Sequence, residues 1–132
     1  MLEDLHHVQL AMPKGAEAAA RDFYSGLLGL EVVEKPPVLA ARGGLWFERG
    51  NIRVHLGVEQ PFRPAKKAHV AFRVRGLGGL AALADRLAAG GCDIRPDADL
   101  PGFNRFYTDD PFGNRLEFLE PEPRETAPKS LC

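Results

Sequence analysis

The sequence predicts an α+β fold: two tandem β-α-β-β-β modules form a curved, mostly antiparallel sheet with helices on its convex side. Two observations predict it. Possible metal ligands recur at one interval, since the pairs His7/His69 and His55/Glu117 are separated by 69 − 7 = 62 and 117 − 55 = 62 residues. The order of strand-like and helix-like segments also repeats. At 132 residues and 45% hydrophobic content, the chain suits one domain whose two halves share a core.

The first half, residues 1–60, begins with alternating apolar and polar side chains, as a strand with one buried face does. An alanine-rich segment with apolar residues at spacings of three and four then predicts an amphipathic helix. The Pro36-Pro37 pair predicts an extended loop, and Gly50-Asn51 predicts a hairpin turn. The expected elements are strands at 5–12, 30–33, 45–48 and 52–58 and a helix at 16–28.

The second half, residues 61–120, repeats this order after a proline-containing connector at 60–68. The glycine pair Gly90-Gly91 ends the predicted helix. The expected elements are a helix at 80–88 and strands at 69–74, 92–95, 105–108 and 115–119. Residues 121–132 contain prolines and charges without periodicity, which predicts a loosely packed C-terminal tail.

The composition excludes several classes of protein. A net charge of −1, from 17 basic and 18 acidic residues, argues against nucleic-acid binding, which needs clustered positive charge. The sequence has no apolar run long enough for a membrane span and no secretory signal pattern. Its cysteines, Cys92 and Cys132, form no Cys-x-x-Cys motif. We therefore expect a cytoplasmic protein with a small-molecule substrate, and no nucleic-acid or membrane partner.

The repeated positions predict a metal site. Each possible ligand has the strand parity opposite to its large apolar neighbours, so a curved sheet would gather the ligands on its concave face. We expect His7, His69 and Glu117 to bind a divalent metal, whose charge would offset the cost of burying the carboxylate. His55 is a further ligand, a hydrogen-bond partner of a ligand, or a base. Zn, Ni, Co, Mn or Fe would suit these donors, whereas His6 is expected on the opposite face.

Substrate-orienting residues are also predicted. Arg105 and Tyr107 share one face of a strand and could hold a carboxylate or enediolate oxygen; the alternative is a surface arginine and a packed tyrosine. Gln9 lies on the ligand face beside His7 and could bind a substrate oxygen. One of the adjacent residues Trp46 and Phe47 is expected to face the cleft.

Four motifs together resemble the vicinal oxygen chelate superfamily, which includes glyoxalases, bleomycin resistance proteins and extradiol dioxygenases. The resemblance covers about residues 5–120. The motifs are His7-x-x-Leu10, Phe23-Tyr24-x-x-x-Leu28-Gly29-Leu30, the strand beginning at His69, and Asp110-Pro111-x-Gly113-Asn114-x-Leu116-Glu117. The resemblance implies that His7, His69 and Glu117 are metal ligands and that the protein is a homodimer.

The chain departs from several of these relatives. In glyoxalase I and the epimerases of the superfamily, the metal ligand on the fourth strand is a Glu or Gln. The similar position of this chain holds His55. The set of two histidines and one carboxylate resembles that of extradiol dioxygenases, which are about twice as long. Residues 100–104 differ from the serine-rich loop of fosfomycin-modifying transferases.

The expected function is that of a metal-dependent enzyme which chelates two oxygens of a small substrate, as a lyase, isomerase, thiol transferase or dioxygenase. Glu117 or His55 would move a proton. The alternative is a non-catalytic binding protein of the bleomycin resistance type.

Overall fold

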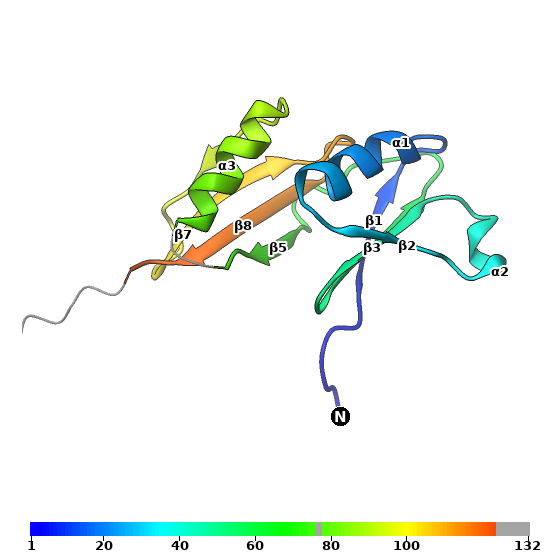
Figure 1. The fold of residues 1–132 in the computed structure, drawn as a ribbon, viewed down its shortest axis with the longest axis horizontal. Helices are drawn as coiled ribbons and strands as arrows, with labels where there is room; N and C mark the ends of the chain where they lie inside the picture. The colour runs from blue at the N-terminus through cyan, green and yellow to red at the C-terminus, as the bar shows by residue number, and fades with distance from the viewer. Residues whose placement is uncertain (76–77, 124–132) are drawn as a thin grey trace, which may run out of the picture. The chain divides into compact units, whose positions relative to one another are not determined.

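The computed structural model describes residues 1–75 and 78–123 (Figure 1). The tail expected at 121–132 therefore lies outside the described residues from 124 onward. The described elements are β1 (Val8–Met12), α1 (Glu17–Ala20), η1 (Arg21–Leu27), β2 (Glu31–Val33), α2 (Pro37–Ala40), β3 (Leu45–Arg49), β4 (Ile52–Val58), β5 (Val70–Arg73), α3 (Gly79–Ala89), β6 (Arg95–Pro96), β7 (Phe103–Asp109) and β8 (Arg115–Pro121).

The strands form two four-stranded sheets, in the orders β1-β4-β3-β2 and β5-β8-β7-β6. Each sheet carries its own helix, so the predicted α+β fold of two repeated modules is confirmed. The chain divides into two compact units: Met1–Val70 with Asp109–Leu116, and Ala71–Thr108 with Glu117–Cys132. The turn between β7 and β8 thus belongs to the first unit.

In the first sheet, β1 is parallel to β4, and β3 is antiparallel to both β4 and β2. The register places Gln9 opposite His55 and His55 opposite Trp46. Directly opposite residues project from the same face of a sheet. These three polar and aromatic side chains therefore share one face. Phe47 and Leu56, of opposite parity, are almost completely buried.

The predicted helix at 16–28 forms, but it changes from α to π geometry after Ala20. Leu28 N–H donates to the carbonyl of Phe23, five residues back, at 3.0 Å. The wider π turn lets the adjacent Phe23 and Tyr24 both face the core, where they are 3% and 0% exposed. The Tyr24 ring lies 5.4 Å from that of Phe47 on β3, which fixes this helix to the first sheet.

The prediction of an extended loop at Pro36-Pro37 is wrong in part, because Pro37 is the first residue of the short helix α2. Pro36 is extended, with φ −54° and ψ 144°, and acts as the N-cap. A proline at the first helical position has its φ already set, and the N–H it lacks would have no partner there. The segment between β2 and β3 is thereby given a defined shape.

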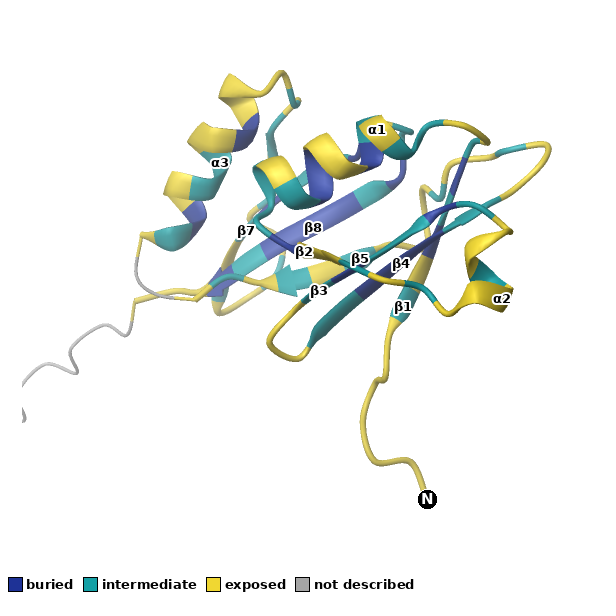
Figure 2. Ribbon diagram, turned by 45° about the vertical axis from the view of Figure 1, so that its right-hand side comes forward, coloured by how far each residue is buried: buried dark blue, intermediate teal, exposed yellow. Residues whose placement is uncertain are grey.

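In the second sheet, α3 packs through Leu80 and Leu87, and Figure 2 shows this buried stripe turned toward β8. The Glu120 carboxylate of β8 accepts a hydrogen bond from Leu80 N–H at 3.2 Å, in the first turn of the helix. A strand was predicted at 92–95, but the observed strand β6 is shorter and begins only at Arg95. Cys92 N–H instead donates to the carbonyl of Leu87 at 2.9 Å, a closure typical of a helix that ends in glycine.

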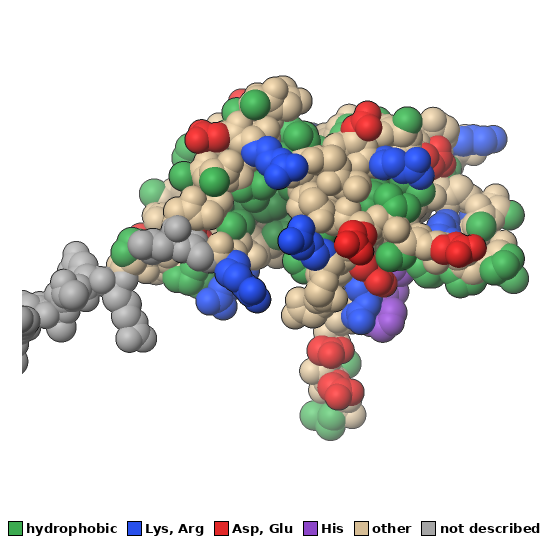
Figure 3. All heavy atoms as spheres, in the orientation of Figure 1, with side chains coloured by type: hydrophobic (Ala, Val, Ile, Leu, Met, Phe, Trp, Pro, Cys, Tyr) green, Lys and Arg blue, Asp and Glu red, His purple; other side chains and the backbone are tan. Residues whose placement is uncertain are grey.

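Charged side chains of both signs are interspersed on the face in view in Figure 3. Among the described residues, no helix is both long and apolar enough to cross a membrane.

Candidate functional site

Three aromatic rings form a stack on one face of the first sheet. The His55 ring of β4 lies 4.1 Å from the Trp46 ring of β3, with 7° between their planes. On its other side it lies 4.1 Å from the His7 ring, at 18°. The structure therefore brings His7 and His55 together. Of the adjacent residues Trp46 and Phe47, it is Trp46 that lies on this face.

Burial within this stack affects the charge of His55, which is 6% exposed. Desolvation lowers the pKa of His55 below its ordinary value, and the charge of His7 lowers it further. The nearby Glu48 carboxylate acts in the opposite direction. His55 is thus biased toward the neutral imidazole, the form that accepts a proton or binds a metal.

The strand parity predicted for His6 and His7 is not observed, because β1 begins only at Val8. The Nδ1 atoms of His6 and His7 lie 2.9 Å apart, and both residues are exposed. An alternation rule holds only within a regular strand. These two residues precede the strand, so their side chains can lie next to each other.

Gln9 lies on the same face as His55 and lines a cavity of about 180 Å³ within the first unit. The walls of this cavity include Trp46 and two cationic residues, Lys35 and Arg42, from the segment that contains α2. Gln9 thus lies on the sheet face that carries the His55 ring. Lys35 and Arg42 were not predicted, because nothing in the sequence indicates that α2 folds back toward this face.

His69 immediately precedes β5 and is exposed. Its Nδ1 lies 2.9 Å from the carbonyl oxygen of Lys67. A carbonyl only accepts hydrogen bonds, so this contact puts the imidazole proton on Nδ1 and the lone pair on Nε2. Metal-binding histidines are commonly held in this way by a hydrogen bond from the second nitrogen.

Glu117, on β8, is buried and already has a cationic partner. Arg105 Nη1 lies 3.4 Å from Glu117 Oε2, and Arg105 Nη2 lies 3.0 Å from Asp97 Oδ1. The hydrogen bond to Asp97 raises the pKa of Arg105. This ion pair offsets part of the cost of burying the Glu117 carboxylate.

Arg105 and Tyr107 share one face of β7, as predicted, and the guanidinium carbon lies 5.2 Å from the centre of the Tyr107 ring. The Asp99 backbone N–H and the Arg105 guanidinium together lower the pKa of Asp97. This carboxylate was missed from the sequence, since it lies in a connection without periodicity. A cavity of about 470 Å³ within the second unit is lined in part by Asp97 and Arg105.

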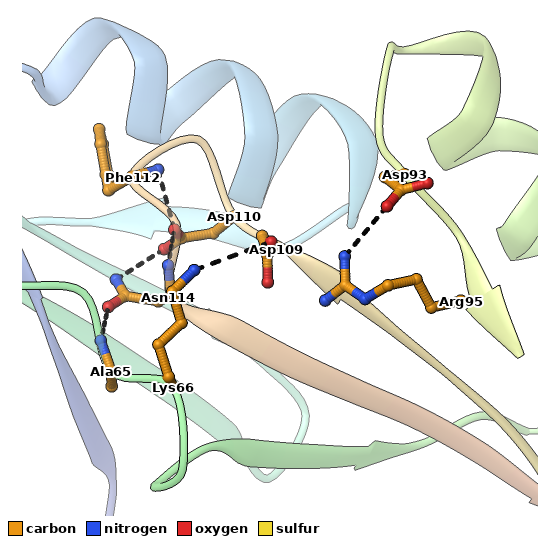
Figure 4. A network of polar contacts seen from close by, with 8 residues as sticks. All are labelled: Ala65, Lys66, Asp93, Arg95, Asp109, Asp110, Phe112 and Asn114. Carbon is orange, nitrogen blue, oxygen red and sulfur yellow. Dashed lines mark hydrogen bonds and ion pairs between the residues drawn. The ribbon is translucent and has the colours of Figure 1, made fainter. Parts of the chain in front are cut away.

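A buried polar network holds the turn after β7 against the rest of the first unit (Figure 4). Asp110 Oδ2 accepts hydrogen bonds from Tyr24 Oη at 2.7 Å and from Asn114 Nδ2 at 2.9 Å. Asn114 also donates to the carbonyl of Ala11 and accepts from Ala65 N–H, both at 2.9 Å. The motif that begins at Asp110 therefore has a structural role. Its buried side chains hold the turn after β7 in place, and we call this network the clamp.

The donors have the right chemistry for a divalent ion, since imidazole and carboxylate are ligands of zinc and related metals. His7 and His69 are exposed, and His55 is biased toward its neutral form. Within residues 1–75 and 78–123, however, no three His, Cys, Asp or Glu side chains are close enough together to hold one ion.

A family model described as the Glyoxalase/Bleomycin resistance protein/Dioxygenase superfamily matches residues 4–118. The chain belongs to this superfamily.

Solved structures agree with membership of the superfamily. A glyoxalase family protein from Bacillus anthracis is 43% identical, with a TM-score of 0.86 over 92% of this chain and 98% of that one. Two more distant structures share the fold. A lactoylglutathione lyase from Agrobacterium tumefaciens is 22% identical (TM-score 0.71, 90% and 94% covered), and an antibiotic binding protein from Streptomyces sp. CB03234 is 20% identical (TM-score 0.68, 92% and 100% covered). No curated protein matches the sequence.

Proposed function

We propose that this protein is a metal-dependent enzyme of the glyoxalase superfamily that acts on a small substrate bearing two neighbouring oxygen atoms. The residues proposed to hold the ion are His7, His69 and Glu117, with His55 as a further ligand or a base. The observation that supports this most directly is the stack of His7 on His55 at 4.1 Å. It joins an exposed imidazole to a buried one biased toward the neutral form.

The remaining polar residues suggest a division of roles. A divalent ion such as Zn, Ni, Co, Mn or Fe would, when bound, act as a Lewis acid on the substrate oxygens. His55 or Glu117 would take up and return a proton. Gln9, Arg105 and Tyr107 would orient the substrate through hydrogen bonds and charge.

Arg105 has a specific feature that suits a substrate-binding role. Its Nε is buried and has no hydrogen-bond partner within the described part of the chain. A buried N–H without a partner is costly, and an oxygen of a bound ligand would relieve that cost. The two Nη atoms meanwhile hold Asp97 and Glu117, which keeps the guanidinium in one orientation.

A second candidate function is binding without catalysis. The ion pair between Arg105 and Glu117 favours it, because the carboxylate is neutralised without a metal. The antibiotic binding protein from Streptomyces shows that the same fold occurs in a protein named for binding. In this alternative the cavities sequester a metabolite or drug, and the histidines only line the binding surface.

Metal content distinguishes the two candidates. We expect purified protein, reconstituted with each of the five ions and then desalted, to retain about one equivalent of one of them by elemental analysis. His69→Ala should lower retention strongly, while Arg21→Gln, which changes an exposed residue of η1, serves as the control and should not. Retention below about a tenth of an equivalent for every ion would overturn the enzyme proposal.

The reaction type can then be sought with the metal-loaded protein. Hemithioacetals test for a lyase, catechols with dioxygen test for a dioxygenase, and epoxides with thiols test for a transferase.

We also propose that the protein is a homodimer, which rests on the resemblance to the superfamily. We propose that it lies in the cytoplasm, which rests on the absence of Cys-x-x-Cys motifs. Light scattering of the purified protein tests the oligomeric state.

A further inference from the structure

A glycine of β4 lines the 180 Å³ cavity of the first unit. Gly57 lies two residues after His55 on β4, so a side chain at this position would project from the same face of the sheet as the His55 ring. A Cβ atom at this position would lie 2.6 Å from Gln9 Nε2. The end of the Gln9 side chain thus takes up the space that a side chain at position 57 would need, and the absence of a side chain there lets the Gln9 amide lie at the cavity.

The walls of the cavity carry positive charge. Lys35 and Arg42 line it, and no acidic side chain does so among the described residues. Neither cation forms an ion pair within the part of the chain that the structure describes. The Lys35 ammonium donates a hydrogen bond to the carbonyl of Gly43, which holds it at the cavity. The Glu17 carboxylate of α1 accepts a hydrogen bond from Gly44 N–H of this loop at 3.1 Å, but the two cations outnumber this one acid.

An aromatic wall completes the cavity. Trp46 covers His55 with one face of its indole and also lines the cavity. An indole beside cationic groups suits a flat organic body that ends in an anionic group. The volume is below the roughly 300 Å³ at which complete ligand pockets begin, so the cavity fits one group of a ligand rather than a large molecule.

We propose that this cavity binds the carboxylate end of a small planar organic anion and thereby sets the substrate class of the protein. Arg42 and Lys35 neutralise the carboxylate, the Gln9 amide donates a hydrogen bond to it, and Trp46 contacts the planar body. The role in substrate choice rests on the function proposed above. Binding of the anion itself does not require the metal.

The chain offers a direct probe, because Trp46 is its one tryptophan. The experiment titrates metal-free protein, treated with EDTA, with benzoate and follows the fluorescence of Trp46. Benzamide provides a neutral molecule of the same shape, and phenyl phosphate provides a different anion. We expect saturable binding of benzoate, with benzamide weaker by about tenfold, since a charge-assisted hydrogen bond contributes about that factor. Added salt should weaken the binding of benzoate.

Two variants test the cavity by different means. Arg42→Gln removes charge and should raise the Kd for benzoate by about tenfold. Arg21→Gln removes an exposed arginine of η1 outside the cavity and should leave the Kd unchanged. Gly57→Ala keeps both cations but displaces the Gln9 amide, and it should also weaken binding. Because the added methyl group meets only the flexible end of Gln9, this variant should fold, which its melting temperature checks.

Equal affinity for benzoate and benzamide, or equal effects of Arg42→Gln and Arg21→Gln, would overturn the proposal. Tighter binding of phenyl phosphate than of benzoate would overturn the choice of a carboxylate. The result is separable from the metal experiment. Metal retention without benzoate binding would defeat this inference alone. Benzoate binding without metal retention would defeat the enzyme proposal and leave the cavity as an anion site of a binding protein.

Discussion

The Tyr24 hydroxyl donates a hydrogen bond to Asp110 Oδ2 at 2.7 Å, across 86 residues of sequence. Both side chains are buried, and Tyr24 is completely excluded from solvent. Asp110 also accepts from the backbone N–H groups of Phe112 and Asn114 at 2.9 Å. The contact therefore ties the helix η1 to the turn between β7 and β8 within the first unit.

Removing this hydroxyl should destabilise the protein. Tyr24→Phe keeps the ring in the core but leaves one acceptor of a buried carboxylate without its donor, which costs about 1–3 kcal/mol. Urea unfolding, followed by circular dichroism, measures the change. An unfolding midpoint unchanged from that of the natural sequence would show that water replaces the hydroxyl.

Two adjacent aspartates should differ in their contributions to stability. Asp110→Asn disrupts the buried network, since an amide nitrogen would face the donors, and should cost about 2–4 kcal/mol. Asp109→Asn is the matched control. Asp109 lies 3.9 Å from Lys66 Nζ at the surface (Figure 4), and a pair of this kind contributes at most about 1 kcal/mol. Similar losses in the two variants would contradict the assignment of the clamp to Asp110.

Alkaline pH should weaken the protein through Tyr24. Burial and the charge of Asp110 raise the pKa of Tyr24 well above its ordinary value. The unfolded chain loses this proton near pH 10, whereas the folded chain retains it. The stability from Tyr24 is therefore complete below pH 10 and is lost as the pH rises toward the folded pKa. Urea midpoints between pH 8 and 11 should fall more steeply for the natural sequence than for Tyr24→Phe.

Acidic pH should act through His55. Its pKa is lowered by burial, so the unfolded chain takes up a proton near pH 6.5 while the folded chain does not. Stability should fall as the pH drops below about 6.5. NMR titration of the ring should give a midpoint below that value, and a midpoint above it would refute the buried environment. His55→Gln should remove this part of the pH dependence.

Gly44 should tolerate substitution less than Gly50. Both have positive φ values, +83° and +59°, but a Cβ at Gly44 would lie 2.0 Å from the carbonyl oxygen of Leu56. At Gly50 nothing lies within 4 Å. Gly50→Ala should cost about 1 kcal/mol from backbone strain alone, and Gly44→Ala should cost more than about 3 kcal/mol or prevent folding. Thermal unfolding of the two variants provides the comparison.

Local pattern was sufficient to predict the fold class and most elements of this protein. The turn at Gly50-Asn51 predicted where β4 begins, and the glycine pair after α3 predicted where that helix ends. The matched interval of 62 residues (69 − 7) predicted two repeated modules. The ends of strands and helices depend on neighbouring residues, and an internal repeat keeps its interval along the chain, so the sequence records both directly.

Only the tertiary structure decided which side chains meet. The stacking of Trp46 on His55 depends on strand register, and the cations at the cavity depend on how α2 folds back. The ion pair between Glu117 and Arg105 likewise depends on how β7 and β8 lie beside each other. Such contacts join residues whose separation along the chain carries no periodic signal. Packing and the need to satisfy buried polar groups determine them, and the local pattern does not.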